Sequence, residues 1–196
     1  MKKLMACLLM LLPLWGCQVV PFARELESTM LVQVLGVDWD DGGVTLTAAC
    51  DPSAIGGEGE SVLAAWGEDM EQAQKALQGS GERYVSLTHV TQLILGAETE
   101  VIDVLKAALE EPALGHRATV WQAEKGTAQD LMSAVNGGAK RLSSIELNGN
   151  AEPVTVLQCL MHIEEERRVK IPLLAVRNET LEPAGSRWVE EMLNGA

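Results

Sequence analysis

Three aspartates within four residues form the densest group of possible ligand or acid–base side chains in the sequence: Asp38, Asp40 and Asp41, followed by Gly42. Calcium loops use such clusters, because a hard cation needs several oxygen ligands. The EF-hand spacing is not met, however, and no glutamate stands at its final position. Asp and Gly are also the residues that a tight hairpin turn favours. We therefore expect a hairpin tip at residues 40–43 and no metal site.

The three histidines, His89, His116 and His162, do not have the spacing of a zinc motif, since the sequence contains neither HExxH nor His-x-His. His89 falls in a predicted strand, where we expect it to be half-buried. The sequence also lacks the GxSxG, P-loop and GxGxxG motifs. These absences predict that the protein is not an enzyme and has no catalytic, cofactor-binding or metal-binding residues.

The four cysteines do not form a disulfide framework. Cys7 lies in an N-terminal apolar run and Cys17 follows that run directly. Cys50 and Cys159 could form a disulfide in an oxidising compartment, or they could be two separate buried thiols. The sequence leaves both alternatives open.

The N-terminus has the pattern of a secretion signal. Lys2 and Lys3 precede the apolar run Leu4–Leu14, which is too short to span a membrane as a helix. Gly16-Cys17 at its end resembles the bacterial lipobox, which predicts a lipoprotein signal peptide at residues 1–16, lipidation of Cys17 and a tether at residues 17–28. The alternative is an ordinary signal peptide with an incidental cysteine. Two or more acyl chains would give stable membrane anchoring.

Composition excludes one class of function and permits a packed core. The formal net charge is −13, and a strongly acidic chain repels nucleic-acid phosphates and anionic lipid headgroups. We therefore expect no nucleic-acid partner, and membrane contact through the lipid rather than a basic patch. Hydrophobic residues make up 47% of the chain and aromatic residues only 4%, so the core must consist mainly of aliphatic side chains.

Hydrophobic periodicity predicts strands and helices in alternation. Strands are expected at residues 30–39, 44–50, 61–66, 88–95, 117–123 and 171–176, and helices beginning near Met70, Val101, Thr127 and Pro153. The clearest amphipathic stripe is Val101, Ile102, Leu105, Ala108 and Leu109. A second stripe in the last helix would contain Val154, Leu157, Leu160 and Met161. Thr127-x-x-Asp130 is typical of a capping box.

This order of elements predicts the fold class. Strands that alternate with helices indicate parallel pairing, and the first hairpin indicates antiparallel pairing. We therefore expect an α+β fold with a mixed β-sheet and packed helices, as a single domain after the lipoprotein signal peptide. The domain should span residues 29–180, and residues 181–196 should be the stub of a following domain.

Several segments, read in order, resemble the Ger(x)C family of spore germination lipoproteins, the C subunits of spore germinant receptors. After the lipobox cysteine Cys17, the matching segments are Arg24-Glu25-Leu26, Gly36-Val37-Asp38, the acidic turn at residues 40–43, the run Leu87–Glu98, Glu111-Pro112-Ala113-Leu114, the strand 118–123 and Lys125-Gly126-Thr127-Ala128. Each segment is short, but their order and spacing together are specific.

The resemblance implies that residues 29–180 are the N-terminal domain of a germinant-receptor C subunit, in a shortened member of a family whose usual members are about twice as long. Such lipoproteins lie on the outer face of the spore inner membrane. They act without catalysis, together with the membrane-embedded A and B subunits that sense nutrient germinants. The alternative class is a substrate-binding lipoprotein of a transporter, and a surface hydrolase is disfavoured because no nucleophile motif is present.

Overall fold

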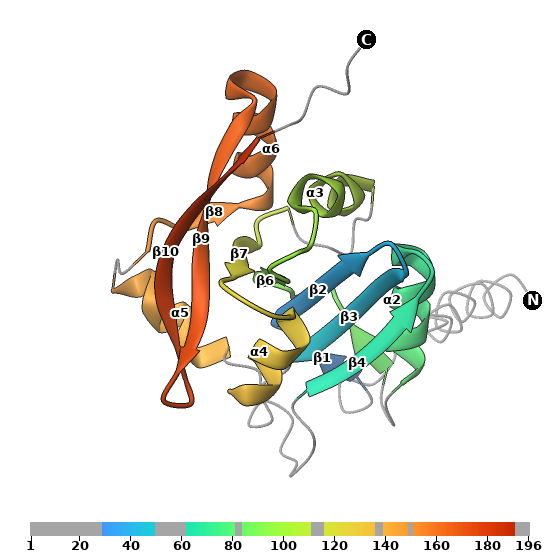
Figure 1. Ribbon diagram of the computed structural model, residues 1–196. Coiled ribbons are helices and arrows are strands. Elements are labelled where there is room, and N and C mark those ends of the chain that lie inside the picture. The colour runs from blue at the N-terminus through green and yellow to red at the C-terminus, as the bar shows by residue number, and fades with distance from the viewer. Residues whose placement is uncertain are drawn as a thin grey trace, which may run out of the picture.

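The computed structural model describes residues 29–49, 62–80, 84–110, 116–135, 139–148 and 151–190. Its main feature is an eight-stranded mixed sheet, in which seven strands follow the order β10-β9-β7-β6-β2-β3-β4 and β8 pairs with β7 (Figure 1). A separate pair of short parallel strands joins β1 to β5. The expected α+β fold with a mixed sheet and packed helices is therefore confirmed.

Strands and helices alternate along most of the chain. The strands are β1 (Thr29–Leu31), β2 (Val34–Asp40), β3 (Gly43–Ala49), β4 (Val62–Gly67), β5 (Tyr84–Ser86), β6 (Gln92–Leu95), β7 (Thr119–Ala123), β8 (Val154–Thr155), β9 (Arg168–Arg177) and β10 (Thr180–Glu190). The helices are α2 (Met70–Gly79), α3 (Val101–Glu110), α4 (Ala128–Ala134), α5 (Ala139–Leu147) and α6 (Val156–Glu166).

Four strands, β2, β6, β7 and β9, run parallel to one another in the middle of the sheet. β3 and β4 extend it antiparallel on one side, and β10 does so on the other. All four residues of β6 are buried, as expected for a parallel strand that is covered on both faces. The carboxyl ends of β2, β6 and β7 therefore meet at the same edge of the sheet.

The acidic segment forms the predicted hairpin tip. Asp40 pairs with Gly43 across the turn between β2 and β3. The Asp40 side chain accepts a hydrogen bond from the Gly42 N–H at 2.7 Å. Gly43 has a φ of +140°, which glycine adopts without steric cost.

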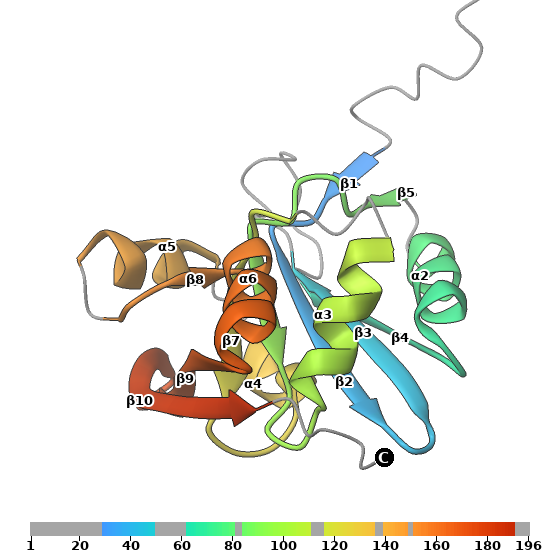
Figure 2. The ribbon, with the colours of Figure 1, turned by 90° about the horizontal axis from the view of Figure 1, so that it is seen from above.

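The helices cover both faces of the sheet. Buried residues of α2, α3 and α6 belong to one apolar cluster, and those of α4 and α5 belong to a second. Alternate residues of the central strands divide between the clusters, so Leu93 and Leu95 face the first while Ile94 faces the second. Figure 2 shows α2, α3 and α6 side by side along their face.

Helix α3 occupies the predicted position, but its buried stripe is rotated from the expected one. Val101, Leu105 and Ala108 are buried as predicted, and Val104 joins them. Leu109, which was expected to face the sheet, is 48% exposed. The spacing of the stripe predicted the helix correctly, but α3 presents Val104 rather than Leu109 to the core.

Other expectations about the elements need correction. The strand expected at residues 30–39 is divided between β1 and β2, and the one expected at residues 88–95 is confined to β6. The last helix begins at Val156 instead of Pro153, because Val154 belongs to β8. Its exposed side therefore carries Leu157 and Met161, while Val156, Cys159 and Ile163 are buried. Helix α5 was not predicted.

The C-terminal part of the described chain continues the sheet. Residues 181–196 were expected to begin another domain, but residues 180–190 form β10, which is hydrogen-bonded to β9 over almost its whole length. Leu181 is fully buried in the second apolar cluster. Residues 181–190 therefore belong to the same sheet, whereas residues 191–196 lie outside the described segments.

Candidate functional site

The predicted lipidation site, Cys17, lies outside the described residues, as do the proposed signal peptide at residues 1–16 and the tether at residues 17–28. In the part of the chain that is described, no helix has the length and apolar character needed to cross a membrane.

Asp38, near the carboxyl end of β2, accepts hydrogen bonds from the N-terminus of α4. Its Oδ1 accepts a hydrogen bond from the Ala128 N–H at 2.7 Å, and its Oδ2 accepts one from the Gln129 N–H at 3.1 Å. The Thr127 side chain caps the same helix by accepting a bond from the Asp130 N–H. The Asp38 carboxylate therefore serves as a structural link between β2 and α4.

Two glycines make room for this link. A Cβ atom on Gly36 would lie 2.6 Å from the Met132 sulfur of α4, closer than two such atoms can approach. A Cβ atom on Gly96 would collide with the Asp38 carboxylate. These close approaches give a physical reason for glycine at both positions, and both occur in the segments that carry the family resemblance.

The loop after β6 is fixed by bonds from three other elements. The Gln122 amide of β7 donates to the carbonyl oxygens of Gly96 and Ala97 at 3.2 and 3.3 Å. The Arg187 guanidinium of β10 also donates to the Ala97 carbonyl, at 3.0 Å. Thr99 Oγ1 accepts a bond from the Trp39 N–H at 3.1 Å. We call the residues that join β2 to α4 and to the loop after β6 the central seam; they are Gly36, Asp38, Gly96, Thr99 and Gln122.

Burial raises the pKa of the Asp38 carboxyl above its ordinary value of 3.8. The two backbone N–H groups oppose this shift, because they favour the charged form, whereas the nearby Asp130 and Asp40 add to it. Both oxygens of the carboxylate already accept backbone bonds. The described segments contain no group of three His, Cys, Asp or Glu side chains that could hold a metal ion.

The three histidines lie on separate segments. His89 is exposed in a turn, with its Nδ1 3.0 Å from the Thr88 hydroxyl, so the expectation of a half-buried strand residue was wrong. His116 is exposed just before β7. His162 is exposed on α6, with its Nδ1 3.8 Å from a Glu166 carboxylate oxygen.

Cys159 is a fully buried free thiol on the inner side of α6. Burial raises the pKa of this thiol from 9.0 to about 12, so it remains protonated at neutral pH. Cys50 lies outside the described residues.

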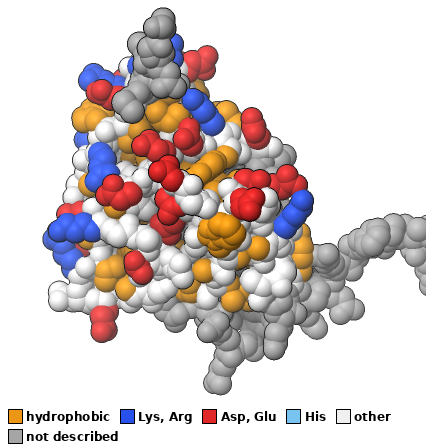
Figure 3. Space-filling view, turned by 45° about the vertical axis from the view of Figure 1, so that its right-hand side comes forward, with side chains coloured by type: hydrophobic (Ala, Val, Ile, Leu, Met, Phe, Trp, Pro, Cys, Tyr) orange, Lys and Arg blue, Asp and Glu red, His pale blue; other side chains and the backbone are white. Residues whose placement is uncertain are grey.

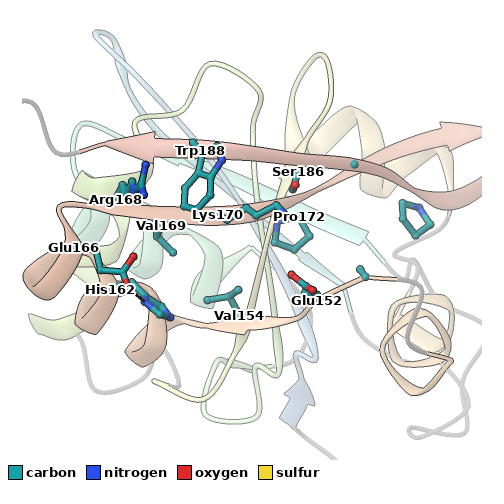
Figure 4. A pocket seen from close by; sticks show the side chains of 13 residues that line it. Glu152, Val154, His162, Glu166, Arg168, Val169, Lys170, Pro172, Ser186 and Trp188 are labelled. Atoms are coloured by element: carbon teal, nitrogen blue, oxygen red, sulfur yellow. Dashed lines mark ion pairs between the residues drawn. The ribbon is translucent and has the colours of Figure 1, made fainter.

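A pocket of about 370 Å³ lies between β8 and the β9–β10 hairpin. Figure 4 shows Val154 of β8 and Val169 of β9 directed toward one another across it, with His162 and Glu166 of α6 at one end. Arg168 of β9 stacks on the exposed ring of Trp188, 4.9 Å from its centroid. Sequence reasoning missed this pocket, because β10 was not predicted and β8 was taken as the start of a helix.

The outer surface agrees with the strongly acidic composition. Figure 3 shows Asp and Glu side chains gathered over the middle of one face, with apolar patches between and below them.

The match to a known family follows the described fold closely. The sequence model of the family described as the spore germination protein N-terminal domain matches residues 23–176. Comparisons with curated proteins and with solved structures gave no match. The family match contains the central seam and all strands except β10 and the last residue of β9, so the chain belongs to the family of spore germination proteins that share this N-terminal domain.

Proposed function

We propose that the protein is a lipid-anchored subunit of a spore nutrient germinant receptor and that it acts through contacts with other proteins. The observation that carries this proposal is the family match over residues 23–176. The N-terminal pattern adds a membrane attachment, because a short apolar run ends in Gly16-Cys17. The protein would then lie on the outer face of the spore inner membrane, beside the membrane-embedded A and B subunits.

The lipid anchor is tested by replacing the proposed attachment site. Cys17→Ala should leave an uncleaved precursor or release the protein from the membrane, since the acyl chains supply the stable attachment. Cys7→Ala is the matched control, because Cys7 lies inside the apolar run and should leave processing unchanged. Membrane fractionation and the mass of the mature N-terminus are the measurements. A correctly cleaved, membrane-bound Cys17→Ala protein would contradict lipidation at this residue.

The receptor role is tested in spores. Spores that lack the protein should lose or slow their response to at least one nutrient germinant, while germination by a non-nutrient trigger continues. The wild-type chain should restore the response. An unchanged response to every nutrient tested would contradict a receptor role.

The partners are tested by isolation from spore membranes. A tagged protein should recover the receptor's A and B subunits after solubilisation in mild detergent. A tagged Cys17→Ala protein serves as the comparison, because it should be absent from the membrane and recover neither subunit. Recovery of a transporter without receptor subunits would favour the substrate-binding alternative instead.

A further inference from the structure

One edge of β7 pairs with β8 along its first residues and with β9 along its last. In the described segments, this arrangement leaves two strand edges open toward the pocket. β7 pairs with β8 at Thr119 and Val120, and with β9 only at Gln122 and Ala123. Within the described segments, the first half of β9, residues 168–172, therefore has a strand partner only on the side of β10. β8 likewise pairs with β7 alone. We call the space between these two open edges the slot.

The length of the open β9 edge suits a short extended segment. The open part of β9 is five residues long, and a strand rises about 3.3 Å per residue, so it can pair with a segment of three or four residues. The pocket of about 370 Å³ opens between the same two edges. Unpaired strand edges present backbone donors and acceptors that readily take up another extended chain.

The two faces of the slot differ in chemistry. Val154 and Val169 pack against the first apolar cluster, on the side of α6. Arg168 and Lys170 alternate with Val169 along β9, so they project to the opposite face. A strand inserted here would meet aliphatic side chains on one face and two cations on the other.

We propose that the slot binds an extended segment of a partner polypeptide, in which apolar residues alternate with acidic ones. Its apolar side chains would contact Val154 and Val169, and its carboxylates would lie beside Arg168 and Lys170. Two acidic residues also line the pocket: Glu166 lies beside His162, and Glu152 precedes β8. This inference concerns a different part of the molecule from Cys17 and does not depend on the receptor role.

The test uses the full chain in detergent micelles and the blocked tetrapeptide acetyl-Val-Glu-Val-Glu-amide. Titration followed by ¹H–¹⁵N NMR should give saturable shifts at Val154, residues 168–171 and the Trp188 indole. Acetyl-Val-Lys-Val-Lys-amide should bind at least tenfold more weakly, because its charges are reversed. An analogue in which an ester replaces the central amide should bind about fivefold more weakly, because one backbone N–H is lost.

Protein variants separate the slot from general charge attraction. Lys170→Glu should weaken binding of the acidic peptide at least tenfold, and Lys170→Ala should weaken it less. Lys125→Glu is the matched control, since Lys125 is an exposed lysine outside the slot and its change should leave binding intact. Unchanged urea unfolding of each variant shows that the fold is preserved. The proposal is overturned by the absence of shifts at millimolar peptide, by equal binding of acidic and basic peptides, or by equal binding of amide and ester.

Discussion

The central seam and the slot lie in the same mixed sheet, but their polar groups are paired to different extents. In the seam, backbone and side-chain donors are directed at partners, and glycines bring α4 and the loop after β6 into direct contact with β2. In the slot, two strand edges have no partner strand among the described residues, and the charged side chains of Arg168 and Lys170 are exposed. The contacts of the seam therefore stabilise the domain, whereas the strand edges of the slot can still pair with another extended chain.

The largest expected difference in stability is between variants of two tryptophans, the buried Trp121 and the exposed Trp188. Trp121 of β7 is fully buried and donates its indole N–H to Gln92 Oε1 at 2.6 Å. Trp121→Ala should lower the free energy of unfolding by about 3–5 kcal/mol, because it leaves a large cavity and an unpaired buried amide. Urea unfolding followed by circular dichroism measures this loss. A loss below about 1 kcal/mol would mean that the second apolar cluster, which contains Trp121, is not closely packed.

Helix α3 offers a comparison within one element. Leu105 is fully buried, and Leu109, one turn later, is 48% exposed. Leu105→Ala should cost about 2–5 kcal/mol, whereas Leu109→Ala should change stability by less than about 0.5 kcal/mol. Equal losses in the two variants would show that the described orientation of α3 is wrong.

The close approach of α4 to β2 is tested at Gly36. Gly36→Ala should destabilise the protein by about 1–3 kcal/mol, because the added methyl group must displace Met132. Gly79→Ala is the control, since a Cβ atom there would meet nothing within 4 Å at the end of α2. Chemical unfolding should rank Gly79→Ala as neutral or slightly stabilising, and the reverse ranking would contradict the close packing.

Asp38→Asn tests the charge in the seam. The folded-state pKa of Asp38 is raised, so its protonated form contributes stability that is fully present below pH 3.8 and is lost as the pH rises through the raised pKa. Relative to Asp38→Asn, the wild type should therefore be more stable at pH 3 than at pH 7. Urea unfolding at both pH values gives the comparison. A difference of the opposite sign would mean that the two N–H bonds outweigh burial.

The smallest effect is expected in the slot. Trp188 is 54% exposed and contacts Arg168 through its ring. Trp188→Ala should cost only about 0.5–1 kcal/mol, the usual strength of an exposed cation–π contact. The same unfolding assay should therefore separate it clearly from Trp121→Ala. A loss as large as that of Trp121→Ala would remove the distinction between seam and slot.

Local patterns in the sequence predicted the elements that depend on near neighbours. The Asp-Gly turn at residues 40–43 and the apolar periodicity after Met70 and Val101 specify a hairpin and two helices, and these form as expected. Helix α5 was missed because Leu142 and Ile145 are the only buried apolar residues among those of the helix whose burial is described. β10 was missed because Pro183 and Gly185 interrupt its pattern.

The candidate sites depend on contacts between residues far apart in sequence. Asp38 was grouped with Asp40 and Asp41 of the predicted hairpin, yet its partners Ala128 and Gln129 are 90 and 91 residues away. No local pattern contains that pairing, although Gly36-Val37-Asp38 and Thr127 both stood in segments that resembled the family. The slot was even harder to predict from the sequence, because it forms where β7 pairs first with β8 and then with β9.

The position of β2 in the middle of the sheet determines the order in which the domain can assemble. β2 is the first long strand of the sheet to be synthesised, and it can pair at once with β3 through a two-residue turn. Its other edge must wait for β6, and β7 and β9 follow later still. Until then a strand of buried, apolar residues has one exposed edge, which is a site of misassociation during folding. Slowed synthesis between β4 and β6 would prolong this exposure of the β2 edge.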